Sequence, residues 1–234
     1  MARAGPVHYD ASGGELAAIL LVSTPVFLIG GTIGMVVARS VSPLALMILH
    51  PGWAVFWGAI LIAMAALVIG SYWTIRAQLT GPIGDFLGIV VVMLLPITFV
   101  AVGLALFTGR AITRRDSAYA VSEEDLPLAL DLLTAMTDAM VLLIGVGFGL
   151  TIVILGGLLD RAAGKRQVLG AVGLLLGAAV LVLNFALLFT GEATPLFHIG
   201  IVSVILASLW LVPFGVLMVR DARIGTRSVG REWL

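Results

Sequence analysis

The sequence predicts an all-α fold, a polytopic membrane helix bundle with six transmembrane helices. Hydrophobic residues make up 61% of the 234 residues, and the mean hydropathy is +1.17, whereas soluble domains contain about 45–50% apolar residues. Only 11% of the residues are charged, against about 25% in soluble domains. The apolar residues form six long stretches without an internal Lys, Arg, Asp or Glu. No remaining stretch could build a second core, so we expect a single integral membrane domain over 1–234.

Each apolar stretch is long enough to cross a bilayer, because about 20 residues of helix span about 30 Å of hydrocarbon. The predicted spans are 16–38, 53–75, 86–109, 139–159, 168–190 and 199–219. The first is longer than the apolar core of a signal peptide, which has about 7–15 residues. We therefore interpret it as the first membrane helix.

The distribution of basic residues predicts the orientation, because Lys and Arg accumulate in short cytoplasmic loops. Nine of the 13 basic residues fall on the side of the termini and of the 76–85 and 160–167 connections. The other four, Arg39, Arg110, Arg114 and Arg115, fall on the opposite side. We expect both termini in the cytoplasm and the protein in the inner (plasma) membrane of a prokaryotic cell.

Two segments outside the spans carry patterns of their own. Ser122 precedes three acidic residues, as at a helix N-terminus, and apolar residues then recur every three or four positions. This pattern predicts an amphipathic helix over about 123–138 on the outer surface, leading into the fourth span. The tail, 220–234, carries four arginines at spacings of three or four. It is expected to contact anionic lipid.

Tryptophan and tyrosine suggest where the helices end, glycines suggest where they pack closely, and prolines suggest where they bend. Trp53 and Trp57 begin the second span, and Tyr72 and Trp73 end it, as expected for rings that prefer the headgroup region. Glycines allow close helix approach in a bilayer, and we expect this at Gly30, Gly31, Gly145, Gly147, Gly149, Gly156 and Gly157. Prolines should bend the first, third and sixth helices, at Pro25, Pro96 and Pro213.

Candidate catalytic residues lie at the predicted outer ends of the helices: His50, Asp131, Asp138, Glu192 and His198. Imidazoles and carboxylates bind metal ions and act as general acids or bases, and His50, His198 and Asp138 are the candidate metal ligands. Asn184 lies about 9 Å below that surface and is a candidate ligand-binding residue. None of these residues has a short metal-ligand spacing, so the alternative is a set of interfacial side chains and a structural asparagine.

Several chemistries lack support in the sequence. There is no cysteine, which excludes thiolate metal sites and thiol redox chemistry. Basic and acidic residues balance at 13 each, so we expect no nucleic acid partner. The spans carry no ionisable residue of the kind that ion-coupled carriers place within the membrane. We identify no cofactor motif, and neither His50 nor His198 lies within a span, where a membrane haem would be bound.

The segment from Leu209 to Gly215, with the sequence Leu-Trp-Leu-Val-Pro-Phe-Gly, is followed by apolar residues and a basic end. In this it resembles uncharacterised six-helix prokaryotic membrane proteins that share a domain of unknown function. The resemblance covers the C-terminal half, where an Asp before the fourth span, a Gly-rich run and a short basic turn recur in the same order. It implies a topology and brings no activity or site residue.

Three functions remain open. The favoured hypothesis is a non-enzymatic scaffold or accessory subunit, with the lipid bilayer and other membrane subunits as its partners. The second is a carrier or binder of a neutral or apolar solute in an outward-facing cavity near Asn184. The third is a membrane enzyme with an outward-facing histidine and carboxylate site.

Overall fold

The computed structural model describes residues 11–41, 51–79, 81–113, 126–160, 165–190 and 195–229. These residues form helices without a strand among them. The helices are α1 (Ala11–Val41), α3 (Pro51–Gln78), α4 (Pro82–Val92), α5 (Leu94–Thr113), α6 (Leu126–Asp160), α7 (Lys165–Thr190) and α8 (Pro195–Val229). Within the described residues, six helical segments are long and apolar enough to cross a membrane, with α4 and α5 together forming one of them.

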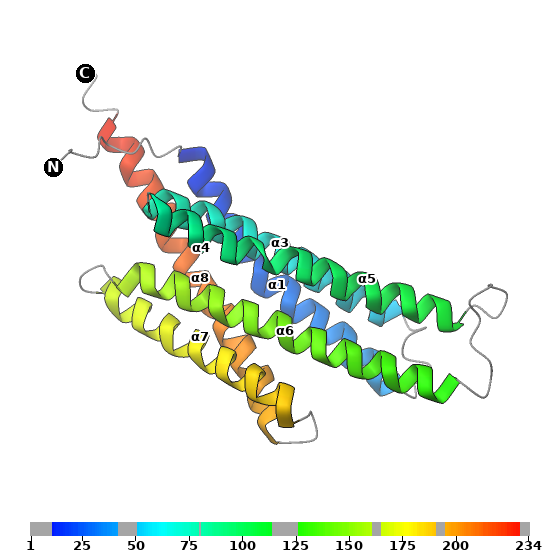
Figure 1. Cartoon of the computed structure of the whole chain (residues 1–234). Helices are drawn as coiled ribbons and strands as arrows, with labels where there is room; N and C mark the ends of the chain where they lie inside the picture. Colours follow the sequence, from blue (N-terminus) through cyan, green and yellow to red (C-terminus); the bar gives the residue numbers. More distant parts are fainter. Residues whose placement is uncertain are drawn as a thin grey trace.

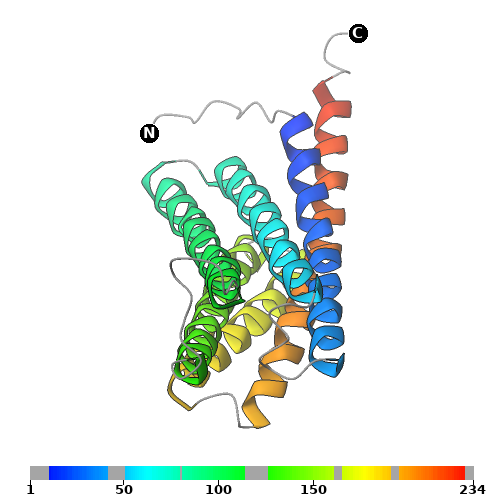
Figure 2. The ribbon, with the colours of Figure 1, turned by 90° about the vertical axis from the view of Figure 1, so that its right-hand side faces the viewer.

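The helices form a closed ring in chain order. Each span packs against the next, and α8 returns to pack against α1. Successive spans run in opposite directions, as short connections require, so the start of α1, the α3–α4 turn, the end of α6 and the end of α8 share one end of the bundle (Figures 1 and 2). We call this the basic end, because Arg76, Arg166 and Arg220 lie there. The opposite end holds the starts of α3, α6 and α8.

The predicted spans agree closely with the helices. The six candidate spans are Gly13–Gly34, Gly52–Gln78, Pro82–Leu106, Ala139–Asp160, Arg166–Leu187 and Ile199–Arg220. Two helices, α6 and α8, continue well beyond their apolar stretches. Residues 220–229, expected as the start of a basic tail, continue α8 without a break.

The structure shows no separate amphipathic helix before the fourth span. Residues 126–138 are instead the first turns of α6, continuous with the span itself, and residues 123–125 lie outside the described part of the chain. At 1.5 Å per residue, these 13 residues add about 20 Å to the helix. Leu128, Leu132 and Met136 lie four residues apart along it and are exposed.

The third span is interrupted where proline predicts it. α4 ends at Val92 and α5 begins at Leu94, with Met93 between them. Pro96 has no N–H to donate to the carbonyl four residues earlier, and its ring crowds that carbonyl. Pro25 and Pro213 lie inside α1 and α8 without interrupting either helix.

The α3–α4 turn brings the third span back antiparallel to the second. Gly81 adopts φ +88°, a conformation that side chains with a Cβ rarely take. Pro82 follows in the first helical turn of α4, where its missing N–H carries little cost. Arg76 and Asp85 form an ion pair across the turn, and both side chains are well exposed.

Glycines bring α6 and α7 into backbone contact at two levels. A Cβ on Gly149 would lie 2.9 Å from the carbonyl oxygen of Gly177, and a Cβ on Gly177 would lie 2.8 Å from that of Gly149. Two turns along, Gly156 and Gly170 face each other in the same way, with distances of 3.0 and 2.8 Å. Between apolar helices in a bilayer, association depends on such close van der Waals packing.

The glycine prediction is confirmed at Gly149 and Gly156 but not at every predicted position. Gly31 packs against α3, where an added Cβ would lie 3.0 Å from the Cβ of Ala59. A Cβ on Gly157 would meet only the Leu174 side chain at 3.8 Å, and one on Gly30 would meet no atom within 4 Å. The sequence identifies the small residues. Which of them are in contact depends on which face of each helix packs against its neighbour.

Candidate functional site

Asn184 is the one predicted site residue whose side-chain surroundings are described in detail. It lies on α7 with 6% of its surface exposed. Its Nδ2 donates a hydrogen bond to the carbonyl oxygen of Val180, one turn earlier, at 2.8 Å. The amide fills the space left by Gly145 of α6, so that a Cβ on this glycine would collide with Asn184 Oδ1. The asparagine therefore packs in the α6–α7 interface.

Three of the predicted catalytic and metal-ligating residues, Asp131, Asp138 and His198, lie on helices whose first turns share the opposite end of the bundle (Figure 1). Asp131 is exposed on α6. Asp138 follows on the same helix, about 10 Å farther along its axis, and His198 lies in the first turn of α8, but the structure does not describe the side chains of these two residues. His50 and Glu192 lie outside the described residues. Whether these imidazoles and carboxylates meet thus remains a prediction.

Among the described side chains, no group of three or more His, Cys, Asp or Glu residues could hold a metal ion. A direct metal site needs ligand atoms about 2 Å from one centre. This statement does not extend to the candidate set of His50, His198 and Asp138, because the structure does not describe the side chains of these three residues.

Buried hydroxyl groups in the bundle mostly bond to the backbone of their own helix. Thr74, Thr98 and Thr151 each donate to the carbonyl oxygen four residues earlier, at 2.8–2.9 Å. Ser203 and Ser208 donate to the carbonyl three residues earlier, at 2.7 Å. In hydrocarbon, such local bonds satisfy the polar group without a partner helix or a ligand.

Besides the Arg76–Asp85 ion pair, Trp210 and Gln78 make polar contacts with a neighbouring helix. Trp210 of α8 donates from Nε1 to the carbonyl oxygen of Leu169 on α7 at 2.9 Å, and its ring lies over Gly173. Nearer the basic end, Gln78 Nε2 lies 3.6 Å from the sulfur of Met218. The Trp210 contact ties the sixth span to the fifth through a buried indole.

Trp53 and Trp57 begin the second span, as predicted, but their side chains face the interior of the bundle. Tyr72 and Trp73, at the other end of α3, are exposed, but Trp53 is only 5% exposed and Trp57 is fully buried. The two indoles align with Ile60, Met64 and Leu67 at alternating spacings of four and three residues. This periodicity is the signal that predicts an inward-facing position.

Three buried polar atoms on α3 have no hydrogen-bond partner among the described residues: Trp53 Nε1, Trp57 Nε1 and Ser71 Oγ. An unpaired buried donor or acceptor costs about 1–3 kcal/mol. Ser71 lies about 21 Å along the helix from Trp57, so the indoles form a separate pair.

No family model, curated protein or solved structure matches the chain. The resemblance to six-helix prokaryotic membrane proteins therefore stays a prediction.

The contact between Gly145 and Asn184 gives a test of the structural role of the asparagine. We expect Gly145→Ala to lower the stability of the bundle by about 1–3 kcal/mol, the usual cost of overpacking, because the new methyl group collides with the amide. In an Asn184→Ala background the same change should cost much less. The measurement is unfolding of the purified protein in mixed micelles with increasing SDS.

Gly30→Ala is the matched control, since a Cβ there meets no atom within 4 Å. Equal losses from Gly145→Ala with and without Asn184 would contradict the described packing, because side chains in contact couple energetically.

Proposed function

We propose that the protein is a non-enzymatic scaffold or accessory subunit of the inner membrane, acting through helix and lipid contacts, with both termini in the cytoplasm. One observation carries the proposal: most of the buried hydroxyl groups, and the Asn184 amide, bond to carbonyls of their own helices. The polar groups of the described interior are thus largely occupied by hydrogen bonds within their own helices. The surface that remains for interactions is the outer face of the ring.

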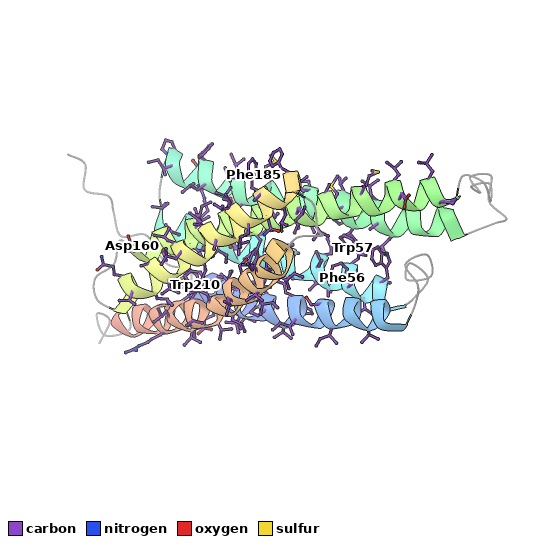
Figure 3. All side chains as sticks on the ribbon, turned by 90° about the horizontal axis from the view of Figure 1, so that it is seen from below. Phe56, Trp57, Asp160, Phe185 and Trp210 are labelled. Atoms are coloured by element: carbon purple, nitrogen blue, oxygen red, sulfur yellow. The ribbon has the colours of Figure 1, made fainter. Side chains whose placement is uncertain are left out.

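The outer face is rich in large apolar side chains. Phe99 on α5, Leu175 on α7 and Val216 on α8 are all more than half exposed. Phe185 also points away from the bundle (Figure 3). Such a surface suits lipid chains and the helices of another membrane subunit.

The orientation rests on charge. Arg76, Arg166 and Arg220 lie at the basic end, and Lys165 begins α7 there. Backbone continuity also places Arg223 and Arg227 on the last turns of α8. Basic residues flanking spans are typical of the cytoplasmic side, where they also meet anionic lipid.

The orientation predicts a clear result from paired reporter fusions. A reporter active only in the cytoplasm should be active after Leu234, because the end of α8 lies at the basic end. A reporter active only outside the cytoplasm should be active within 114–125, because α5 ends and α6 begins at the opposite end of the bundle. The reverse pattern, with both fusions well expressed, would overturn the orientation.

Site-specific photo-crosslinking in native membranes tests the scaffold role. A photoreactive residue is placed at four exposed positions on different helices: Ile19, Phe99, Leu132 and Leu175. A scaffold should give a discrete adduct with another membrane protein at one or two of these positions and lipid adducts at the rest. The same variants, purified and reconstituted in lipid alone, are the control. Lipid adducts at all four positions in native membranes would count against a subunit partner.

A further inference from the structure

Trp53 and Trp57 form a compact aromatic pair in the first two turns of α3. Their ring centroids lie 5.8 Å apart with the planes at 78°. Phe56 packs edge-on against Trp57, with centroids 5.1 Å apart, and the two rings lie side by side in Figure 3. Both indoles are at least nine-tenths buried.

The two indole N–H groups point to a missing acceptor. Neither Nε1 atom has a hydrogen-bond partner among the described residues. Trp210, an equally buried indole in the same bundle, donates to a carbonyl oxygen at 2.9 Å. Buried polar groups in folded proteins are nearly always paired, so two unpaired donors one turn apart call for a specific explanation.

The neighbouring side chains offer apolar packing. Towards the middle of α3, the same face continues with Ile60, Met64 and Leu67, all buried. On another face, Gly31 and Gly34 of α1 press against the backbone of Gly52 and Phe56. The described neighbours supply no acceptor, and the pair lies at the start of α3, where the span begins near the membrane boundary.

The chemistry of the position favours a group that only accepts. A hydrogen-bond donor placed there would itself need an acceptor among apolar neighbours, which is costly. The start of a helix also carries the positive end of its macrodipole, which attracts oxygen atoms with partial or full negative charge. Lipid ester and phosphate oxygens have this character and occur at the depth where a span begins.

We propose that Trp53 and Trp57 together bind one acceptor oxygen, supplied by the ester or phosphate group of a membrane lipid or by a buried water molecule. Both indoles donate to it, which fixes the first two turns of α3 against the bundle. The site is independent of whether the protein acts as a scaffold.

The test uses the full chain with ¹⁵N-labelled tryptophan in nanodiscs. Single Trp→Phe variants assign the indole resonances. One sample contains ester-linked phosphatidylcholine and the other its ether-linked analogue, which keeps the phosphate but lacks the carbonyls. We expect the Trp53 and Trp57 N–H resonances at the hydrogen-bonded position of Trp210. Trp210 is the internal control, because its acceptor is Leu169 in either lipid.

Each outcome identifies the source or rejects the site. A shift of the Trp53 and Trp57 signals between the two lipids assigns the oxygen to the ester carbonyl. Magnetisation transfer from lipid headgroup protons in both samples assigns it to the phosphate, and transfer from water assigns it to a buried water. N–H signals at an unbonded position in both lipids, as for indoles directed at neighbouring ring faces, would overturn the proposal. So would bonded signals with no response to lipid or water, since the acceptor then belongs to the chain.

A stability measurement provides a second readout. If a lipid ester is the acceptor, the wild-type protein should unfold at a higher temperature in ester lipid than in ether lipid. The difference should vanish in the Trp53→Phe/Trp57→Phe variant and persist in Trp73→Phe, whose indole is exposed at the other end of α3. If the difference persists without both indoles, the lipid acts elsewhere and the assignment to a lipid ester is overturned.

Discussion

Replacing Gly149 and Gly156 together with leucine should prevent α6 and α7 from packing. Each added side chain would enter space held by the α7 backbone, since even a Cβ would lie 2.7 Å from Leu181 N at one position and 2.7 Å from Leu174 N at the other. Overpacking in a core costs about 1–3 kcal/mol per site, and more where the obstacle is backbone. We expect loss of the monodisperse peak in detergent size-exclusion chromatography and rapid degradation in cells.

The matched control is Gly103→Leu on α5. This glycine is exposed and a Cβ on it meets no atom within 4 Å, so the variant adds the same apolar bulk to a span without entering a contact. It should express and elute like the wild type. If the Gly149→Leu/Gly156→Leu double variant behaved in the same way as this control, the described backbone contact between α6 and α7 would be wrong.

Gly173→Leu should separate α7 from α8. The indole of Trp210 lies over this glycine, and its Cε2 would be 2.7 Å from a Cβ there. Displacing the ring also breaks the hydrogen bond to Leu169, and interhelical bonds of this kind are worth about 0.6–2 kcal/mol in membranes. Together with the overpacking cost of about 1–3 kcal/mol, we expect a larger loss than from Trp210→Phe alone, measured by SDS unfolding in mixed micelles.

A second change should partly restore the packing. Trp210→Ala removes the ring that the new leucine meets, so the double variant should be more stable than Gly173→Leu alone. Additive losses would show that the two side chains do not share the same space.

The positions of the spans follow from the sequence because the bilayer imposes a single strong constraint. Charge-free apolar stretches of about 20 residues have to be helical in hydrocarbon, where each backbone polar group needs an internal partner. This reasoning locates the fourth span from Ala139 to within one residue of its described end at Asp160. The break at Met93 follows from Pro96 in the same way.

The ends of the helices do not follow from hydropathy, because a helix can continue in water wherever its hydrogen bonds are maintained. α6 starts 13 residues before its apolar stretch, at Leu126, and α8 continues past its own stretch to Val229. Neither extension has a proline in its interior after the first turn, and helical backbone bonds need no apolar surroundings. The amphipathic spacing at 126–138 thus indicated a helix but not its continuity with the span.

The candidate site was harder to predict. The sequence gives the position of a residue along its helix, but it does not give the direction in which the side chain points around the helix axis. The position of Asn184 two turns below the end of α7 is readable from the sequence, whereas its contact with Gly145 depends on how α6 and α7 face each other. Trp53 and Trp57 show the same limit. Their position at the start of a span suggests the headgroup region, but their alignment with Ile60 and Met64 turns them inward.

The closed ring has a consequence for the order of assembly. Synthesis runs from the N-terminus, so α1 can pair with α3 early, but its other flank, where Ala18 and Val22 meet Gly215 of α8, stays open to lipid. That contact joins the first and the last helix, so it forms only after the last span has entered the membrane. A ribosome-bound chain that stops before α8 thus has five spans in an incomplete ring. The flanks of α1 and α7 that α8 covers in the finished bundle are then exposed to lipid, insertion factors and proteases.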